Sequence, residues 1–337
     1  MKAPTLNDVY VARERISPYL TRTPLLRHPL LDEATGLSIW VKHENHNPTC
    51  AFKVRGGVNL VGAMALEERT KGIVTASTGN HGQSIAMASR IHGVPCTVFV
   101  PVGNNPEKNA AMRAYGATLE EVGRDFDEAR ERCEQRAAET GARYVHSANE
   151  PLLIAGVGTY ALEIFEDLPN ADVIFVPIGG GSGCCGLITV RNALGSRARI
   201  IGVGAARADA IYRSWRGPQR VVGQSADTFA EGIATRVTFD LTFGIFKEHL
   251  DDFLLLSEDD LAAGVRLALG TTHNLAEGAG AAALAAAYLR RDELAGLRVV
   301  CVMSGGNIDQ AKLKMVLGCA AAEASASAQA SADKSAR

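Results

Sequence analysis

The stretch VIFVPIGGGSGCCGLITV, residues 173–190, contains the features that decide the fold class. An apolar run from Val173 to Val176 comes first, and four of the five residues from Gly179 to Gly183 are glycines. The residues Leu187 to Val190 then continue with an apolar pattern that fits a helix. These 18 uncharged residues could suggest a membrane span, but Pro177 and the glycines favour a strand, a turn and a helix.

Similar β-branched runs recur along the chain and alternate with longer segments of helical periodicity. Residues 106–115 and 126–140 are two such segments, with apolar residues three or four positions apart and charges between them. Strands that alternate with helices predict a parallel sheet in an α/β fold. Besides the run at Val173, the predicted strands are residues 38–42, 72–76, 96–100, 143–145, 199–203 and 298–302.

The composition excludes several classes of protein and partner. The chain has 337 residues, of which 47% are hydrophobic and 21% are charged, as in globular proteins of one large domain or two smaller ones. Its 35 Lys and Arg against 37 Asp and Glu give a net charge of -2. The chain thus has no excess of positive charge with which to bind nucleic acid or an anionic membrane. The N-terminus lacks an apolar signal segment, so we expect a cytoplasmic location.

Small polar turns follow three of the predicted strands: STGNHG at residues 77–82, GGGSG at residues 179–183 and SGGN at residues 304–307. Ligands of open α/β sheets bind at the carboxyl ends of the strands, so we expect the three turns to border one crevice. Glycines admit an anion close to backbone N–H groups, and the start of the following helix favours negative charge. Residues 179–183 are therefore a predicted phosphate cradle; the alternative is a turn that needs glycine only for a positive φ.

Residue spacing disfavours other cofactors and metals. The pattern Gly181-x-Gly183-x-x-Gly186 matches a dinucleotide fingerprint, but no acid that could bind a ribose follows about 20 residues later. No Gly-Lys-Ser/Thr sequence follows it either, which argues against a P-loop. None of the seven cysteines forms a Cys-x-x-Cys pair, and the two histidines of His43-Glu44-Asn45-His46 are spaced too closely for a zinc-protease motif.

Lys53 is the candidate for a covalent link to a phosphorylated aldehyde. It lies in FKVRGG, residues 52–57, between a predicted strand and a helical segment, with Phe52 and Val54 on either side. A lysine partly removed from water at this place is shifted towards its neutral, nucleophilic form. The alternative is a solvated surface charge, the commoner case for a lysine considered alone.

Four blocks of this chain, in order, resemble the fold type II pyridoxal-phosphate enzymes, in the branch of threonine/serine dehydratases and serine racemases. The blocks are FKVRG at residues 52–56, STGNHGQ at 77–83, GGGSG at 179–183 and SGGN at 304–307. The resemblance covers about residues 5–317. It implies a tryptophan synthase β-like α/β fold of two domains, each with a mostly parallel sheet flanked by helices.

The resemblance also implies how the chain is divided and assembled. A large cofactor-binding domain would comprise residues 1–70 and 150–318, with a small domain of residues 71–149 inserted in it. The Ala/Ser-rich residues 319–337 have no apolar periodicity and are predicted to form a disordered tail. Relatives of this kind imply a homodimer or homotetramer.

The resemblance assigns pyridoxal 5'-phosphate as cofactor and gives each matching residue a role. Lys53 would bind the aldehyde, Asn80 would face the 3-oxygen and Ser304 the pyridine nitrogen. The full set of cofactor-binding residues would be Phe52, Lys53, Asn80, Gly179, Gly180, Gly181, Ser182, Gly183, Glu277 and Ser304. The substrate carboxylate would be bound by Ser77, Thr78, Gly79, Asn80 and His81, at the start of a helix. Alternatively, Glu277 is only a favourable charge at a helix N-terminus, and His81 has a structural role.

The implied reaction removes the β-hydroxyl of a 3-hydroxy amino acid such as L-threonine or L-serine, giving a 2-oxo acid and ammonia. Lys53 would serve as the base that takes the Cα proton. The neutral hydroxyl of Ser304 stabilises a protonated pyridine less than a carboxylate would, so long-lived carbanions are disfavoured. Elimination is therefore expected rather than transamination.

Departures from the family's pattern bear on three properties: racemase activity, a metal requirement and the size of the substrate. Thr78 stands where racemases carry a serine as second acid–base group; its methyl disfavours racemisation, although a catalytic hydroxyl remains. Gly204 and Ala210 replace two acids of cation-binding relatives, so no metal requirement is predicted. Residues 146–151 differ from the usual loop near the substrate, which allows a bulkier substrate such as phenylserine, 3-hydroxyaspartate or a hydroxyectoine-derived compound.

Several interpretations remain open from the sequence. A second substrate carboxylate would need an arginine, for which Arg55 and Arg130 are candidates, although both could equally be solvated helix charges. A serine racemase and a β-replacement synthase are enzymatic alternatives. A sensor that binds a phosphorylated ligand without catalysis is the alternative from another class.

Overall fold

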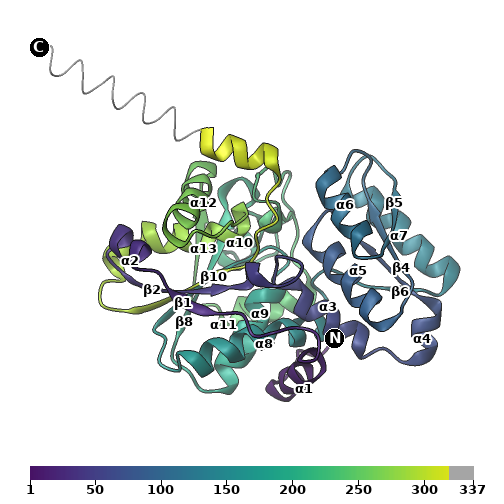
Figure 1. Cartoon of the computed structure of the whole chain (residues 1–337), viewed down its shortest axis with the longest axis horizontal. Coiled ribbons are helices and arrows are strands. Elements are labelled where there is room, and N and C mark those ends of the chain that lie inside the picture. The colour runs from purple at the N-terminus through teal and green to yellow at the C-terminus, as the bar shows by residue number, and fades with distance from the viewer. Residues whose placement is uncertain (319–337) are drawn as a thin grey trace, which may run out of the picture.

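The computed structural model describes residues 1–318 as two β-sheets, each covered by helices on both faces (Figure 1). The larger sheet and its helices lie on the left of Figure 1, and the smaller sheet with its helices lies on the right. The predicted α/β fold is confirmed. The predicted tail, residues 319–337, lies outside the described residues. Among the described helices, none has the length and apolar character that crossing a lipid bilayer requires.

The larger sheet has six strands in the order β1-β2-β10-β7-β8-β9, and all neighbours are parallel except β1 and β2. Val300 of β10 is in register with Trp40 of β2 and with Ile174 of β7. The strand that leads to Ser304 therefore lies beside the strand that leads to the glycine-rich turn. The strands are β1 (Leu25–Arg27), β2 (Ser38–His43), β7 (Val173–Pro177), β8 (Arg199–Ala205), β9 (Asp252–Leu256) and β10 (Arg298–Met303).

Helices cover both faces of the larger sheet. In β7, Val173 and Phe175 face a core that includes α12 and α13, whereas Ile174 and Val176 face a core that includes α8 and α9. A strand buried on both faces must be apolar throughout, which explains the continuous apolar run in the sequence. The helices of this half are α1 (Leu6–Ile16), α2 (Pro29–Thr35), α8 (Pro151–Asp167), α9 (Ser182–Ala193), α10 (Ala210–Arg216), α11 (Asp240–His249), α12 (Glu258–Thr272) and α13 (Gly278–Leu289).

The smaller sheet has four parallel strands in the order β5-β4-β3-β6. Its strands are β3 (Ile73–Ala76), β4 (Cys96–Val100), β5 (Thr118–Glu121) and β6 (Arg143–Tyr144). The helices around it are α4 (Leu66–Lys71), α5 (Asn80–His92), α6 (Pro106–Ala114) and α7 (Phe126–Thr140). The assignment of residues 71–149 to a separate domain stays a prediction.

Helix α3 (Lys53–Gly62) packs against both halves of the molecule. A Cβ added at Gly57 would lie 2.3 Å from Ser84 Oγ of α5, and one added at Gly56 would lie 2.8 Å from the carbonyl oxygen of Leu153 in α8. Only glycine allows the helix backbones to approach this closely. Because α3 begins at Lys53, this packing fixes the candidate lysine between the two sheets.

The seven strands and two helices predicted from the sequence are confirmed, with ends shifted by at most two residues. The sequence analysis missed β1, β5 and β9, which are all edge strands. Edge strands are short or partly charged because one side of each faces solvent or a covering loop. The turn after β10 also differs from expectation: instead of leading directly into a helix, Gly305 forms an isolated bridge with Ala51.

Buried ion pairs hold the start of α3 in place. The Arg55 guanidinium donates to Glu44 from Nε at 2.7 Å and from a terminal nitrogen at 2.9 Å, and to Glu163 at 2.7 and 2.8 Å. Lys42 also donates to Glu163, at 2.5 Å. Burial lowers the pKa of Arg55, but Glu44 and Glu163 outweigh it, so the net shift is upward. Two cations balance two carboxylates, so the network is neutral as a whole and Arg55 stays charged.

Replacing Arg55 with Met should lower the free energy of unfolding by about 3–5 kcal/mol, because Glu44 and Glu163 would lose a buried partner. Urea denaturation at pH 7 measures the change. Arg213→Ala is the matched control, since Arg213 is exposed and lies 3.7 Å from Asp209; it should alter stability by less than about 1 kcal/mol. An Arg55→Met protein as stable as this control would contradict the assigned role.

Candidate active site

A cleft of about 880 Å³ lies where the two sheets face each other. Its walls contain every residue that the sequence analysis assigned to cofactor or substrate: Phe52, Lys53, Ser77, Thr78, Gly79, Asn80, His81, Gly179, Gly180, Gly181, Ser182, Gly183, Glu277 and Ser304. The three predicted turns do border one crevice, because the strands before them are parallel and end at the same edge of each sheet. The roles of the individual residues stay predictions.

Lys53 is the first residue of α3 and extends into the cleft. Its Nζ donates to the carbonyl oxygen of Ser147 at 3.0 Å, lies 3.5 Å from Ser182 Oγ, and is 5.5 Å from the centre of the Phe52 ring. Burial lowers the pKa of Lys53 to about 8. The amine is therefore far easier to deprotonate than a surface lysine, as a nucleophile or base near neutral pH requires.

The glycine-rich turn leads into the N-terminus of α9. Gly181 has a φ of +92°, but the glycines before it are needed for another reason. A Cβ added at Gly179 would lie 2.1 Å from the carbonyl oxygen of Gly232. A Cβ added at Gly180 would lie 2.6 Å from Ala148 Cβ. The turn therefore needs glycine both for its backbone conformation and for close packing. No described side chain caps α9, so its first N–H groups remain available to an anion.

The turn before α5 differs in detail from the predicted carboxylate site. Ser77 Oγ accepts hydrogen bonds from the N–H of Gly79 at 3.2 Å and of Gly82 at 2.8 Å, so this hydroxyl shapes the turn. His81 Nε2 lies 2.9 Å from Thr75 Oγ1, and burial together with the charge of Lys53 lowers the pKa of His81 to about 3. The structural alternative for His81 is thus favoured.

Glu277 and Asn80 form a polar pair across the cleft. Asn80 Nδ2 donates to the Glu277 carboxylate at 2.7 Å, and Asn80 Oδ1 accepts from Asn307 Nδ2 at 2.7 Å. Glu277 also occupies the N-cap position of α13, as the alternative interpretation expected, and its role beside the cofactor stays a prediction. Burial raises the pKa of Glu277. Asn307 lies in the matched SGGN block but had no assigned role; its hydrogen bond shows that it orients Asn80.

Ser304 lies at the end of β10, with its hydroxyl 3.5 Å from the carbonyl oxygen of Ala279. The residue is buried, and it lines the cleft beside the start of α13. A contact of this length is weak for a hydroxyl donor, which leaves Ser304 able to bind a ligand nitrogen. The role of Ser304 at the pyridine nitrogen stays a prediction.

The two candidate arginines have different positions. Arg55 is buried in the ionic network under α3, so it does not reach the substrate and that candidate is wrong. Arg130 of α7 does line the cleft. His146 also lines the cleft; it belongs to the loop of residues 146–151 that the sequence analysis placed near the substrate, but it had no assigned role. Sequence reasoning missed other residues of the cleft wall, among them Lys108 and Arg236. No motif surrounds them, and only the folding of separate loops brings them to the cleft.

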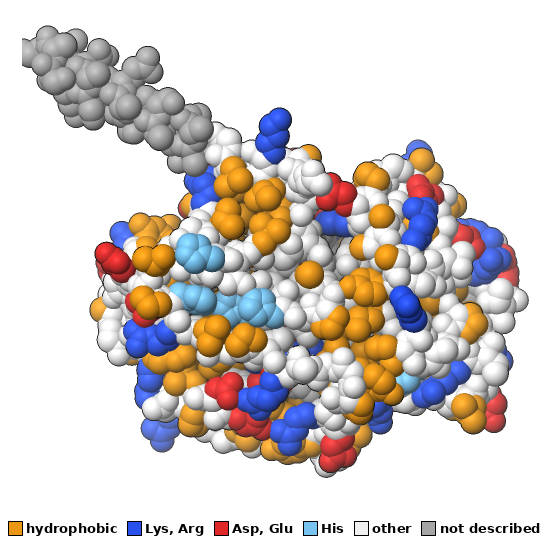
Figure 2. Space-filling view, in the orientation of Figure 1, with side chains coloured by type: hydrophobic (Ala, Val, Ile, Leu, Met, Phe, Trp, Pro, Cys, Tyr) orange, Lys and Arg blue, Asp and Glu red, His pale blue; other side chains and the backbone are white. Residues whose placement is uncertain are grey.

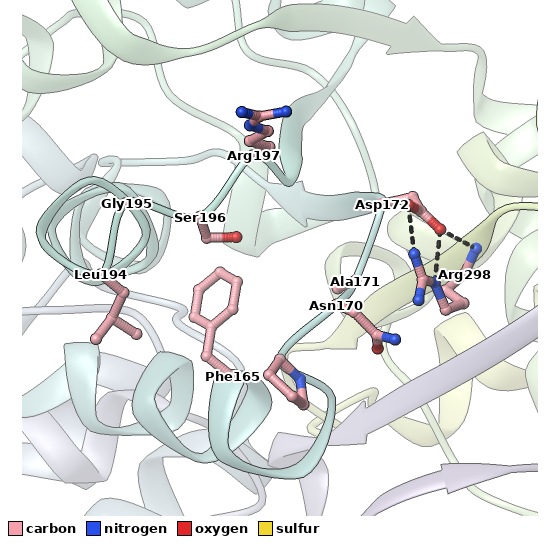
Figure 3. Close-up of a pocket in the computed structure, with 10 residues that line it drawn as sticks. Phe165, Asn170, Ala171, Asp172, Leu194, Gly195, Ser196, Arg197 and Arg298 are labelled. Atoms are coloured by element: carbon pink, nitrogen blue, oxygen red, sulfur yellow. Dashed lines mark hydrogen bonds and ion pairs between the residues drawn. The ribbon is translucent and has the colours of Figure 1, made fainter.

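A second hollow, of about 560 Å³, lies away from these residues (Figure 3). It is at the amino ends of β7, β8 and β10, where Arg298 donates to Asp172 at 2.8 Å from two nitrogens. These hydrogen bonds from Arg298 lower the pKa of Asp172 to about 2. The pair joins two chain segments at the base of the sheet, the end opposite to the one where ligands bind in α/β folds.

The fold and the cleft together are those of an α/β protein with a half-buried lysine and an uncapped helix start in one cleft. Comparisons with known proteins agree. The family model "Pyridoxal-phosphate dependent enzyme" matches residues 16–305. The chain is 39% identical over 307 residues to the L-threonine ammonia-lyase of Geobacter sulfurreducens, covering 91% of this chain and 76% of the relative.

Two further comparisons point the same way. The beta-hydroxyaspartate dehydratase of Paracoccus denitrificans is 32% identical, with 93% of this chain and 99% of the relative covered. The structure of the processed form of threonine deaminase isoform 2 from Solanum lycopersicum has a TM-score of 0.88 and 28% identity, covering 94% of each chain. The chain belongs to the pyridoxal-phosphate dependent enzymes of fold type II, in the threonine dehydratase and serine racemase family.

The residues present fit the cofactor of this family. An amine that burial shifts towards its neutral form suits an aldehyde, and the uncapped start of α9 suits a phosphate. Asn80 and Ser304 place neutral polar groups on the wall of the same cleft, and the resemblance implies that they would face the ring of the cofactor. The described residues contain no group of three or more His, Cys, Asp or Glu side chains arranged to hold a metal ion.

Capture of pyridoxal phosphate by the cofactor-free protein should depend on pH through Lys53. Only the neutral amine attacks an aldehyde, so the capture rate should rise about tenfold per pH unit below pH 8 and level off above it. Stopped-flow absorbance at pH 6–10 measures the rate, with Lys53→Ala as the control that forms no adduct. A rate that keeps rising tenfold per unit to pH 10 would show an ordinary lysine pKa.

Proposed function

We propose that this protein is a pyridoxal-phosphate-dependent ammonia-lyase that removes water from a 3-hydroxy amino acid such as L-threonine or L-serine. The products are a 2-oxo acid and ammonia. The observation that carries the proposal is the half-buried amine of Lys53, which shares one cleft with the starts of helices α5 and α9. The likeness to L-threonine ammonia-lyases supports the reaction type.

The cofactor, when bound, supplies an electron-accepting ring that stabilises negative charge at Cα of an amino acid. The protein supplies the proton transfers. Lys53 Nζ takes the proton from Cα, and a pKa of about 8 suits a base that works near neutral pH. Ser304 presents a neutral hydroxyl, so the ring gains less positive charge than a carboxylate partner would give it, which favours prompt loss of a leaving group.

The start of α5 is the proposed binding site for the substrate carboxylate. Helix N-termini attract anions through their N–H groups and their dipole. Ser77 serves the turn itself, so Thr78 is the residue that presents its hydroxyl to the substrate. The same hydroxyl is the group on which a residual racemase activity would depend.

Ion pairs and hydrogen bonds close one end of the cleft and so limit access of water during the reaction. Lys108 of α6 forms an ion pair with Glu231, and both line the cleft. Asn105 Nδ2 donates to Asp309 at 2.9 Å. Each interaction joins the smaller half of the molecule to the larger one. Excluding water strengthens the electrostatic interactions inside the site.

The charges around Arg130 favour a substrate with a neutral side chain. Arg130 lies 2.8 Å from Glu134 and 3.7 Å from Asp127, and Arg236 also forms an ion pair with Asp127. A second carboxylate on the substrate would have to compete with these two acids for the guanidinium groups. We therefore propose L-threonine and L-serine as better substrates than 3-hydroxyaspartate or other acidic analogues.

We further propose a cytoplasmic homodimer or homotetramer, in agreement with the charge, the composition and the family resemblance. Hydrophobic side chains gather on the face shown in Figure 2, beside a row of histidines. Apolar surface of this kind is common where subunits associate.

Cofactor-loaded protein given L-threonine should release 2-oxobutanoate and ammonia in equal amounts. A lactate dehydrogenase-coupled assay and an ammonia assay measure the two products, and chiral chromatography checks for D-amino acid. Lys53→Ala should lose at least about 10³-fold in kcat, because both the covalent anchor and the base are removed. Release of neither product from any 3-hydroxy amino acid would refute the proposed function, as would full activity of Lys53→Ala.

The same assay tests substrate preference. The kcat/KM for L-threonine or L-serine should exceed that for 3-hydroxyaspartate by at least about tenfold, because the acids beside Arg130 repel a second carboxylate. Asp127→Asn should narrow this difference by removing one of those acids. A wild-type preference for 3-hydroxyaspartate would contradict the assignment.

A further inference from the structure

His146 lies in the cleft and has no part in the reaction as described so far. It follows β6, and its ring lines the same cavity as Lys53. The next residue, Ser147, accepts the hydrogen bond from Lys53 Nζ at 3.0 Å. His146 is therefore adjacent in sequence and in space to the contact that holds the proposed base.

Backbone N–H groups determine which nitrogen of His146 carries the proton. Nδ1 accepts hydrogen bonds from the N–H of Ala148 at 3.0 Å and of Asn149 at 2.9 Å. A ring nitrogen that accepts hydrogen bonds has no proton, so the neutral imidazole is protonated at Nε2.

The imidazole also stays uncharged. Burial, followed by the positive charges of Lys53 and Arg130, lowers the pKa of His146 to about 4, although Glu134 opposes the shift. At neutral pH the ring is therefore a hydrogen-bond donor through Nε2 that brings no net charge into the cleft.

Aromatic neighbours hold the ring in this orientation. The Phe239 ring lies edge-on, with centroids 4.5 Å apart, and the Tyr144 ring is 6.4 Å away. Among the described residues, none accepts a hydrogen bond from His146 Nε2, and this atom is not one of the buried polar atoms left without a partner. The Nε2–H group is therefore accessible to a ligand in the cleft that His146 lines.

We propose that His146 donates a hydrogen bond from Nε2 to the β-oxygen of the substrate and holds the leaving hydroxyl in position. This inference rests on the proposed dehydration. In the proposed function the start of α5 binds the substrate carboxylate and the start of α9 binds the cofactor phosphate. The β-oxygen is then the substrate oxygen that still has no hydrogen-bond donor. As the Cβ–O bond breaks, its electron pair goes to the oxygen, which leaves as water with the proton that Lys53 Nζ took from Cα. His146 keeps its own proton and stabilises the growing negative charge on the oxygen.

The test compares two leaving groups. His146→Asn keeps an oxygen in place of Nδ1 as acceptor for the backbone N–H groups, but it lacks a donor at the Nε2 position. It should lower kcat for L-serine by about 10²-fold and kcat for β-chloro-L-alanine by less than about threefold, because chloride leaves without such a donor. His146→Gln, whose amide N–H reaches farther, should recover part of the activity on L-serine.

His273→Asn is the matched control. His273 is exposed, lies outside the cleft, and has a φ of 54°, which asparagine tolerates. Equal losses on both substrates in His146→Asn, or no loss on either, would overturn the inference. Failure of the wild-type protein to eliminate from either substrate would instead refute the proposed function.

A second measurement does not depend on turnover. In ¹⁵N NMR spectra of the holoenzyme, the ring signals of His146 are identified by their absence from the spectrum of the His146→Asn variant. These signals should show a neutral ring protonated at Nε2 from pH 6 to pH 9. A ring protonated at Nδ1, or one that becomes charged within this range, would overturn the inference.

Discussion

The buried contact of Arg55 with Glu44 and Glu163 is the interaction on which the site depends. Arg55 lies in α3, two residues after Lys53. Its ion pairs join α3 to Glu44, directly after β2, and to Glu163 in α8. The cost of burying these ions is offset because each carboxylate oxygen meets a donor and the charges cancel with Lys42. Since α3 also packs against α5 through its glycines, one helix start sets the position of the reactive amine relative to both sheets.

The surroundings of Lys53 Nζ differ from the rest of the cleft wall, which carries several charged side chains. Among the described residues, no carboxylate pairs with Lys53, and burial alone moves its amine towards neutrality. Around it lie groups that bind through neutral dipoles: the N-termini of α5 and α9, the Ser304 hydroxyl, the Asn80 amide and the His146 imidazole. Preorganised dipoles stabilise changing charge without strong ground-state attraction, which suits a reaction in which negative charge moves from Cα to a leaving oxygen. Charged side chains elsewhere on the cleft wall form ion pairs, as Lys108 does with Glu231.

Arginine assignments illustrate the limit of reasoning from motifs. Arg55 lies in the matched FKVRG block, yet it points into the ionic network, whereas Arg130 and Arg236 reach the cleft from segments without a motif. The edge strands β1, β5 and β9 escaped prediction for a related reason, since a half-solvated strand carries little apolar signal. The sequence placed His146 in a loop near the substrate but gave it no role, because the proposed role depends on the backbone of Ala148 and Asn149 and on the ring of Phe239.

The sequence by itself determined the α/β class and the central strands, and it predicted that Lys53 and the glycine-rich turns would share one cleft. These follow from local patterns: continuous apolar runs make strands buried on both faces, and glycines before a helix make a cradle for an anion. Only the tertiary structure decided that Ser77 and His81 support the turn, that Asn307 orients Asn80, and which arginines meet the substrate cavity. Those outcomes depend on contacts between residues far apart in the chain, and the direction of a side chain at such a contact leaves no trace in local sequence.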